Sequence, residues 1–338
     1  MFMFSKSLDV EGYRVLVSTC IEGRESLAFT YKAYINGDPV VFYGIFVPRD
    51  GISTAIAVLR RLLLNVRLSE DLASNIDFYI RYGNAEYVST RRLRRYLRVV
   101  NAGDGIIIAS PFSTKGPDKA RNEDSVGVLS LKYCGSRGSR LIHAFAIADG
   151  VSGLQAGDYA SSFAVRSFLA SALQLAVSSP GPDVADVLRG VLMDIHSELK
   201  GYGETHGLNT GTTFTGGVIM QSGNVSIVTI LHIGDTRAYK VVGNTVNRLT
   251  VDHSLGGHVI TQALGYVINN IDIARTMLSR NSYLVLTTDG VTDVLSDDRI
   301  AWLIYEYKYP RYIASALINA ARDAGSSDDA SALVIWRT

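Results

Sequence analysis

The chain has 338 residues, of which 47% are hydrophobic and 19% are charged, and its formal net charge is +1. Its length allows about two domains, and the nearly neutral charge excludes a strong attraction to nucleic acid or to an acidic membrane surface. No apolar run approaches the roughly 20 residues of a membrane span, and the first residues lack the long apolar core of a signal peptide. We therefore expect a cytoplasmic protein with no nucleic-acid or membrane partner.

The two cysteines, Cys20 and Cys134, show no metal-binding pattern. They lie far apart in the sequence, and neither has a partner at zinc-binding spacing. Cysteines of cytoplasmic proteins are normally reduced. We expect two reduced thiols, with a disulfide as the alternative.

Residues 1–100 have the pattern of a small α+β domain. The segment "NGDP" (36–39) predicts a hairpin turn between two β-rich runs. The arginine-rich run "RRLRRYLR" (91–98) is interpreted as a solvated helix or hinge, and the alternative is a helix face that meets a phosphorylated partner. The predicted elements are strands at 13–21, 27–35, 39–47 and 76–82 and a helix at 52–68.

The small, glycine-rich segment "NAGDG" (101–105) predicts a domain boundary. Beyond it, groups of strands alternate with pairs of helices, which is typical of an α+β sandwich with sheets inside and helices outside. We therefore expect a second domain over residues 105–338. Its predicted strands are 106–110, 124–131, 141–148, 212–220, 224–233, 236–242, 282–288 and 331–337, and its predicted helices are 155–178, 183–200 and a pair within 297–323.

Five strand ends of this second domain carry carboxylates. Each one alone is best explained as a turn, because Asp and Gly are common in turns for backbone reasons. Together they would repel one another and lose hydration beside apolar strands, and a bound divalent cation removes that cost. Oxygen-only ligands indicate Mg²⁺ or Mn²⁺, and the six histidines form no zinc motif. The carboxylates are Glu123, Asp124, Asp149, Asp235, Asp289, Asp293, Asp328 and Asp329.

Sequence motifs of other hydrolases and of common nucleotide-binding proteins are absent. The chain has no Gly-x-Ser-x-Gly motif, no phosphate-binding Walker loop and no Gly-x-Gly-x-x-Gly motif. Several carboxylates without a nucleophilic Ser, Cys or His favour metal-assisted hydrolysis. Two ions about 3.5–4 Å apart would generate a hydroxide near neutral pH and hold a phosphoryl group for in-line attack.

Eight segments, in this order, resemble the successive motifs of the metal-dependent Ser/Thr protein phosphatases of type 2C. The resemblance covers about residues 105–338. It implies a four-layer α-β-β-α sandwich, here with an additional small α+β domain at the N-terminus, and hydrolysis of phosphoserine and phosphothreonine. The segments are "KGPDKARNEDSVGVL", "FAIADGVSGLQAGDYAS", "NTGTTFTGGVI", "LHIGDTRAYKV", "LTVDHSL", "VITQALG", "LVLTTDGVTDVL" and "SSDDASALVIW".

The resemblance also implies roles for individual residues. Asp149 matches the carboxylate that bridges two divalent ions, Mn²⁺ or Mg²⁺, and Gly150 matches the backbone carbonyl ligand beside it. Asp289 and Asp328 match the other carboxylates of this metal pair. The remaining matches are Glu123 and Asp124, the acidic pair of the first motif, whose glutamate reaches metal-bound water, and Asp235 and Asp293, ligands of a third, weaker metal site. For Asp293 the alternative is an aspartate that caps a helix or interacts with its dipole.

The chain departs from the family pattern in three places. The family's phosphate-binding arginine is replaced by Lys119, which lacks the bidentate fork of arginine, and Arg121 is the alternative phosphate contact. Val151 occupies a position where some members carry a histidine thought to act as general acid. The flap after "LTVDHSL" is missing, since "GGH" (256–258) leads directly into "VITQALG", so a more open cleft is expected. His253 is interpreted as structural, and Gly211, Thr212 and Thr213 as packing residues.

These observations predict a metal-dependent Ser/Thr protein phosphatase whose partners are phosphorylated substrates of Ser/Thr kinases. One alternative is a hydrolase of small phosphate esters with the same fold, and another is a pseudophosphatase that acts as a signalling adaptor. Residues 1–100 are expected to be a regulatory or substrate-docking module, or an extension that packs on the catalytic domain.

Overall fold

The computed structural model describes most of the chain. The arginine-rich run, apart from its last two residues, and most of the predicted boundary at 101–105 lie outside the described part. The described residues are 13–17, 21, 24–65, 76–82, 85–89, 97–101, 107–136, 138–151, 153–177, 183–222, 225–255 and 259–338.

Two antiparallel sheets form the centre of the described structure. In both sheets, each strand is hydrogen-bonded to its neighbours in the order given below. A separate pair joins β1 (Tyr13–Val17) to β6 (Leu97–Asn101). The larger sheet has the order β14 (Asp272–Leu278), β11 (Val225–Ile233), β10 (Phe214–Ser222), β9 (Gly138–Asp149), β8 (Asp124–Gly135), β2 (Ser26–Ile35), β3 (Asp38–Pro48), β4 (Ile76–Tyr82) and β5 (Ala85–Val88). The smaller sheet has the order β13 (Thr245–Arg248), β12 (Arg237–Val242), β15 (Ser282–Thr287), β16 (Ala330–Arg337) and β7 (Ile107–Thr114).

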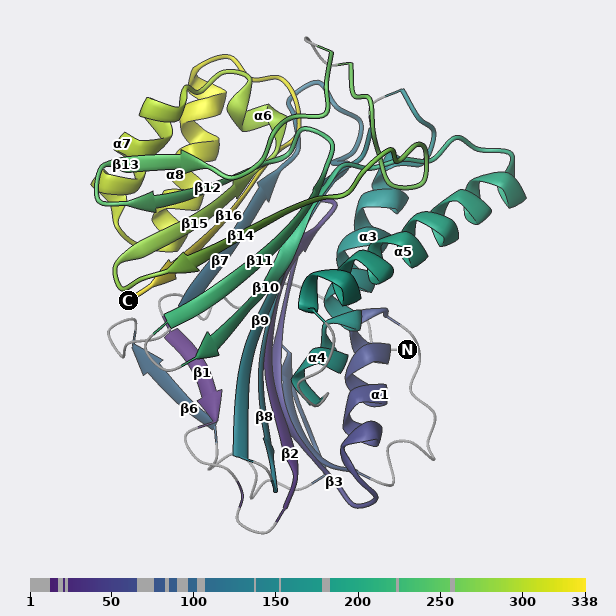
Figure 1. Ribbon diagram of the computed structural model, residues 1–338, viewed down its shortest axis with the longest axis vertical. Coiled ribbons are helices and arrows are strands. Elements are labelled where there is room, and N and C mark those ends of the chain that lie inside the picture. Colours follow the sequence, from purple (N-terminus) through teal and green to yellow (C-terminus); the bar gives the residue numbers. More distant parts are fainter. Residues whose placement is uncertain are drawn as a thin grey trace.

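Helices cover the outer face of each sheet, which gives the predicted four layers (Figure 1). One layer, against the larger sheet, contains α1 (Ile52–Leu63), α3 (Gly157–Ser171), α4 (Leu173–Val177) and α5 (Val184–His206). The other contains α6 (Asp289–Thr292), α7 (Asp297–Tyr307) and α8 (Pro310–Asp323). No helix in the described part of the chain is long and apolar enough to cross a membrane.

The inner faces of the two sheets pack on each other through buried aliphatic and aromatic side chains. Val126 and Phe145 of the larger sheet share a cluster with Leu286 and Leu333 of the smaller one, and all four are buried. These side chains alternate with residues on the opposite face of each strand, as the two-residue period of a strand requires. The sandwich therefore fixes the relative position of strand ends that come from both sheets.

The described N-terminal strands continue the larger sheet. β2 pairs with β8 over ten residues, from Ser26 opposite Cys134 to Ile35 opposite Ser125. The side chain of Phe29 lies in the same buried cluster as Phe168 of α3, and α1 contacts α3 and α4. Of the described strands within residues 1–100, β2, β3, β4 and β5 belong to the larger sheet, whereas β1 pairs with β6 in a separate two-stranded sheet.

The structure differs from the predicted elements in several places. The helix predicted at 52–68 ends at Leu63, and Asn65 just beyond it has a left-handed backbone with φ of 57°. The arginine-rich run at 91–98 was interpreted as a helix or hinge, but its last two residues, from Leu97, belong to strand β6. The strand β14 was not predicted, because it is an edge strand in which Arg275 and Met277 are exposed and no clear alternation marks a buried face.

The expectation of two reduced thiols is wrong. Cys134 lies in β8, is buried and is disulfide-bonded. Cys20 lies outside the described residues. A disulfide was the alternative interpretation. The long separation of Cys20 and Cys134 in the sequence does not show whether the two side chains are close enough in the fold to form a bond.

Candidate active site

Two neighbouring strands of the larger sheet bring a first pair of carboxylates together. Asp124 is the first residue of β8, Asp149 is the last residue of β9, and the two are direct cross-strand partners. Side chains of such partners point to the same face and have Cβ atoms about 4.5–5.5 Å apart. The predicted site therefore begins with two adjacent aspartates at one end of this sheet.

The smaller sheet adds further carboxylates at the same end of the sandwich. Asp289 begins α6 directly after β15, and Asp328 precedes β16, which is the hydrogen-bonded neighbour of β15. The Thr288 hydroxyl donates to Asp124 Oδ2 at 3.0 Å and so joins the two sheets. In addition to burial, the charge of Asp289 raises the pKa of Asp149, which shows that the two carboxyl groups interact. Residues from four strands thus meet in one cluster.

Asp235 and Asp293 lie beside this cluster. Asp235 is buried in the turn between β11 and β12, and the charges of Asp289 and Asp293 both act on it. The Asp293 backbone N–H donates to the Asp289 carbonyl oxygen at 2.8 Å, one turn further along α6. Since Asp293 is at the C-terminal end of α6, it does not cap the N-terminus of that helix, and Ser296 caps α7. The capping alternative therefore has no support in the structure.

Burial and mutual repulsion raise the pKa values of the clustered carboxyl groups. Burial is the first cause for Asp149, and the charges of Asp124, Asp289 and Asp235 add to it, so that its pKa is well above the usual range. Burial also raises the pKa of Asp124 well above normal, and raises those of Asp289 and Glu123. For Asp235, burial and the charge of Asp289 raise the pKa to about 7. The cluster therefore holds more negative charge than its surroundings stabilise.

Several carboxylate oxygens of the cluster have no hydrogen-bond partner. Among the described residues, Asp124 Oδ1, Asp235 Oδ1 and Asp289 Oδ1 are buried and unpaired. Buried oxygens without a donor are costly, and a divalent cation satisfies them at the same time as it neutralises their charge. No three acidic, His or Cys side chains in the described part already surround a cation position. The donor set nevertheless fits Mg²⁺ or Mn²⁺, because the ligands available are all oxygens.

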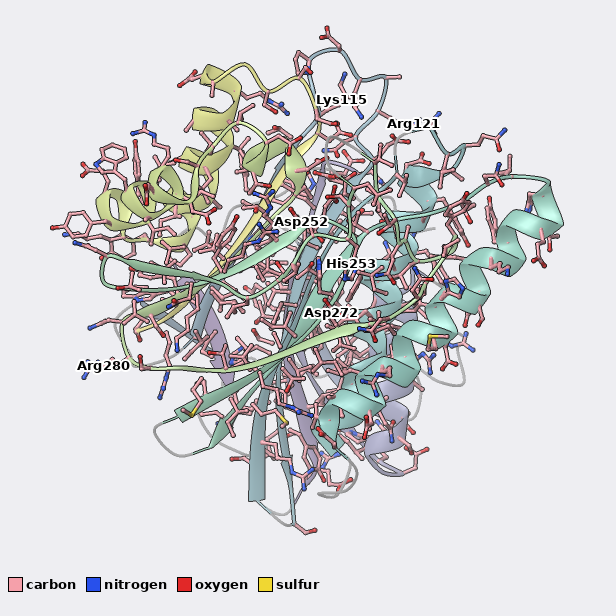
Figure 2. The ribbon with its side chains drawn as sticks, turned by 45° about the horizontal axis from the view of Figure 1, so that its top comes forward. Lys115, Arg121, Asp252, His253, Asp272 and Arg280 are labelled. Atoms are coloured by element: carbon pink, nitrogen blue, oxygen red, sulfur yellow. The ribbon has the colours of Figure 1, made fainter. Side chains whose placement is uncertain are left out.

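Lys119 and Arg121, the two candidates for phosphate binding, occupy different surroundings. Lys119 Nζ lies 2.7 Å from Asp328 Oδ1, and its side chain is only 27% exposed. Burial alone would lower the pKa of Lys119, but Asp328, Asp329 and Asp149 outweigh that effect and raise it. Arg121 is 68% exposed and pairs with Asp158 at 2.6 Å, and Figure 2 shows it at the outer edge of its loop. Lys119 is therefore the cation that faces the carboxylates.

Asp329 holds the loop that carries both of these residues. Its side chain is buried; Oδ1 accepts from the Gly116 backbone N–H at 2.8 Å and Oδ2 accepts from the Glu123 N–H at 2.8 Å. The single carboxylate thus ties the two ends of loop 116–123 to the start of β16. The sequence marks Asp329 only as one of the carboxylates before the last strand, because two adjacent aspartates give no signal as to which one is buried.

Backbone contacts fix Asp149 and the glycine after it. The Thr212 hydroxyl and the Thr213 N–H both donate to the Asp149 carbonyl oxygen at 2.8 Å, so these threonines do more than pack. Gly150 donates from its N–H to the Glu123 carbonyl oxygen at 3.1 Å. A side chain on Gly150 would place its Cβ 2.4 Å from the backbone of Gly157, so only glycine permits this approach.

His253 holds the turn that carries Asp235, which agrees with its structural interpretation. Its Nδ1 accepts from the Gly234 N–H at 3.1 Å, and its Nε2 lies 3.1 Å from Asp272 Oδ2. Because Nδ1 accepts, Nε2 carries the hydrogen and donates to the carboxylate. Figure 2 shows His253 close to Asp272, which is the first residue of the edge strand β14 of the larger sheet. The position of the missing flap, 256–258, lies outside the described residues, so the more open cleft stays a prediction.

The thermal stability of the metal-free protein is expected to fall as the pH rises from about 5 to about 7.5. The folded-state pKa of Asp235 is about 7, against its usual value of 3.8, so the native state binds more protons than the unfolded state between these values. The contribution of Asp235 therefore makes stability decrease with rising pH across this window. Melting curves in chelator at a series of pH values test this, and a flat or rising profile would contradict it.

Comparison with known proteins adds a family assignment and a fold assignment. The family model described as Protein phosphatase 2C matches residues 117–325, which is more than half of the chain. The serine/threonine phosphatase stp of Listeria monocytogenes is 24% identical over 245 residues, which cover 66% of this chain and 93% of that protein.

Solved structures give the same result for the sandwich. The serine/threonine phosphatase PstP/Ppp of Mycobacterium tuberculosis superposes with a TM-score of 0.55 at 24% identity, covering 68% of this chain and 97% of that one. The catalytic domain of PstP in complex with 2 manganese ions gives a TM-score of 0.54 at 25% identity, with the same coverage of 68% and 97%.

Proposed function

Because this chain belongs to the protein phosphatase 2C family, we propose that it is a metal-dependent phosphatase that hydrolyses phosphoserine and phosphothreonine in proteins. The observation that carries the proposal is the cluster of buried, partly unpaired carboxylate oxygens at the shared end of both sheets. Each buried, charged carboxylate lowers the stability of the fold unless a cation is bound beside it. A protein that bound no cation here would therefore be more stable with uncharged residues at these positions.

We assign the carboxylates to two divalent ions, Mn²⁺ or Mg²⁺, and to a third, weaker site. Asp149, the Gly150 carbonyl oxygen, Asp289 and Asp328 would hold the two ions, with Asp124 and Glu123 beside them, and Asp235 and Asp293 the third. When bound, such ions make water a strong nucleophile near neutral pH and stabilise the charge of the phosphoryl group. The manganese-bound relative supports this assignment.

The chain's own residues contribute binding and proton transfer. Water attacks phosphorus, the ester P–O bond breaks, and the leaving serine or threonine oxygen takes a proton to give the alcohol and inorganic phosphate. Lys119 binds the phosphate as a point charge. Glu123 accepts a proton from the attacking water. Burial is the main cause of its raised pKa, which suits it to this role. Val151 has no proton to give, so the leaving oxygen is protonated by water.

The expected partners are proteins phosphorylated by Ser/Thr kinases, and the expected location is the cytoplasm. The raised carboxyl pKa values and the cation site act equally on any phosphate monoester, so they do not distinguish a phosphoprotein from a small ester. A disulfide such as that of Cys134 is uncommon in a reducing cytoplasm outside hyperthermophiles, so the redox state of this cysteine in the cell distinguishes a cytoplasmic location from an oxidising one. Thiol labelling of the protein directly after cell lysis tests the location.

Replacing Lys119 by methionine is expected to lower kcat/KM for p-nitrophenyl phosphate by about a hundredfold, because a desolvated cation at the phosphate is lost. Arg121→Met is the matched control in the same loop. Since Arg121 is exposed and paired with Asp158, its loss should change kcat/KM by about threefold or less. Steady-state kinetics with Mn²⁺ measures both, and equal effects of the two variants would contradict the assignment of Lys119.

A further inference from the structure

The turn between β2 and β3 reaches the acidic end of the sandwich. We propose that this turn, Asn36–Gly37, positions the acidic loop 121–125 of the active site, so that the N-terminal extension is part of the catalytic machinery. Nothing in the family match, which begins at residue 117, assigns a role to these residues. The proposal rests on the proposed function only for its activity measurements.

Asn36 binds both the acidic loop and the start of α3. Its side-chain Nδ2 donates to the Asp158 carbonyl oxygen at 3.0 Å and lies 3.5 Å from Ser161 Oγ. Its backbone N–H donates to Ser125 Oγ at 3.3 Å, and Ser125 directly follows Asp124. One residue of the turn therefore joins the strand that carries Asp124 to the helix that lies behind it.

Gly37 packs directly against Asn122. Its φ is +82°, and a Cβ built on it would lie 2.9 Å from Asn122 Nδ2, so the turn accepts no side chain at this position. Asn122 is buried, and its Oδ1 accepts from the Asp124 N–H at 2.9 Å. Its Nδ2 donates to Ser113 Oγ at 2.9 Å. The turn thus packs against Asn122, the residue that binds the backbone N–H of Asp124.

The acidic loop is held from two sides. Asp329 accepts from the Glu123 N–H on one side, and the β2–β3 turn contacts Asn122 and Ser125 on the other. The same Asp158 that binds Asn36 through its carbonyl oxygen binds Arg121 through its side chain. The turn is therefore linked to the loop of Glu123 and Asp124 and, through Asp158, to Arg121.

The sheet makes this turn a rigid support. Asn36 and Gly37 both have positive φ, 51° and 82°, as in the tight two-residue turns that match the twist of a hairpin. β2 is hydrogen-bonded on both sides, to β3 and to β8. Because Ile35, the residue before the turn, is the cross-strand partner of Ser125, the turn lies directly beside the residue that follows Asp124.

A positioning role and a substrate-docking role predict different kinetics. If the turn positions the carboxylates, its disturbance lowers kcat and Mn²⁺ affinity for every phosphate ester. If the extension only docks protein substrates, KM rises for phosphoproteins, while kcat for p-nitrophenyl phosphate and Mn²⁺ affinity stay unchanged. Small substrates and metal binding therefore separate the two roles.

The experiment compares two disturbing variants with two matched controls in the full chain. Asn36→Gly keeps a backbone that accepts positive φ but removes the amide, and Gly37→Ala introduces the Cβ. The controls also lie at positions of positive φ in the extension: Asn65→Gly, at φ 57°, and Gly51→Ala, at φ 114° with nothing within 4 Å of the added Cβ. The measurements are the dissociation constant of Mn²⁺, kcat and KM for p-nitrophenyl phosphate, and amide hydrogen exchange of residues 121–125.

We expect Asn36→Gly and Gly37→Ala to weaken Mn²⁺ binding and to lower kcat by about tenfold or more, as residues behind metal ligands usually do. KM for p-nitrophenyl phosphate should stay within about twofold, and exchange at 121–125 should become faster. The controls should leave kcat, Mn²⁺ affinity and this exchange unchanged. Should Gly37→Ala fail to fold, Asn36→Gly still decides the question.

Equal Mn²⁺ affinity, kcat and exchange in Asn36→Gly and Asn65→Gly would overturn the proposal. A wild-type protein without phosphatase activity would refute the proposed function instead. In that case hydrogen exchange at 121–125, which needs neither substrate nor metal, still shows whether the turn holds the loop.

Discussion

Replacing Asp149 by asparagine is expected to lower kcat/KM for a phosphothreonine peptide by about a thousandfold and to raise the thermal stability of the metal-free protein. The activity falls because a bridging carboxylate is lost from a metal site that supplies several kcal/mol of transition-state stabilisation. The stability rises because burial and the charges of Asp124, Asp289 and Asp235 raise the pKa of Asp149 well above normal. At neutral pH its ionised form therefore opposes folding, and the neutral amide removes this opposition.

Asp252→Asn is the matched control, and its expected change in thermal stability has the opposite sign. Burial alone would raise the pKa of Asp252, but its bonds to Arg237 and Arg248 outweigh that effect and lower it. Its charge stabilises the native state, so the asparagine variant should melt at a lower temperature. Melting curves in chelator, followed by kinetics with Mn²⁺, measure both properties. An Asp149→Asn protein that melts as early as Asp252→Asn would contradict the repulsive character of the cluster.

Replacing Asp329 by alanine is expected to cost about 3 kcal/mol or more of the free energy of unfolding, because two buried N–H groups lose their acceptor. The donors are Gly116 and Glu123, both at 2.8 Å from the carboxylate. Release of loop 116–123 also displaces Lys119, so kcat should fall by about tenfold or more. Urea unfolding in chelator gives the free energy, and kinetics with excess Mn²⁺ gives kcat.

The neighbouring Asp328 supplies the comparison. Its side chain is 37% exposed and pairs with Lys119, so Asp328→Ala should change the free energy of unfolding by about 1 kcal/mol or less while activity is strongly reduced. Asp329→Asn keeps one acceptor and should fall between wild type and Asp329→Ala in stability. If the two alanine variants were equally stable, Asp329 would not be the residue that holds the loop.

Sequence patterns located the carboxylates, because each follows or precedes an apolar strand. Asp149 and Asp289 are marked by the same Asp-Gly step after a buried run, and Asp124 begins such a run. The order of the motifs then predicted a common site, and the sandwich brings these strand ends together. Local signals were sufficient here because a strand end and its turn are encoded within a few residues.

Long-range pairing was not predictable in the same way. The pattern of β2 predicts a strand, but nothing in it specifies that its partner is β8, about a hundred residues further on. The alternation of hydrophobic residues shows which face of a strand is buried, but it does not show which other strand lies beside it in the sheet. For this reason the sequence predicts a small N-terminal domain or extension without specifying its partner strand, and it does not predict the contact of Asn36 with the acidic loop.

The central claim is that the carboxylate cluster forms a metal-dependent phosphatase site. The most direct test is hydrolysis of a phosphothreonine peptide by the wild-type protein with Mn²⁺, with Mg²⁺ and with chelator, followed by Asp289→Asn under the same conditions. We predict turnover with either ion, no turnover in chelator, and a loss of orders of magnitude in the variant. Turnover that survives chelation, or that is unchanged in Asp289→Asn, would contradict the claim, and so would tight Mn²⁺ binding without any turnover.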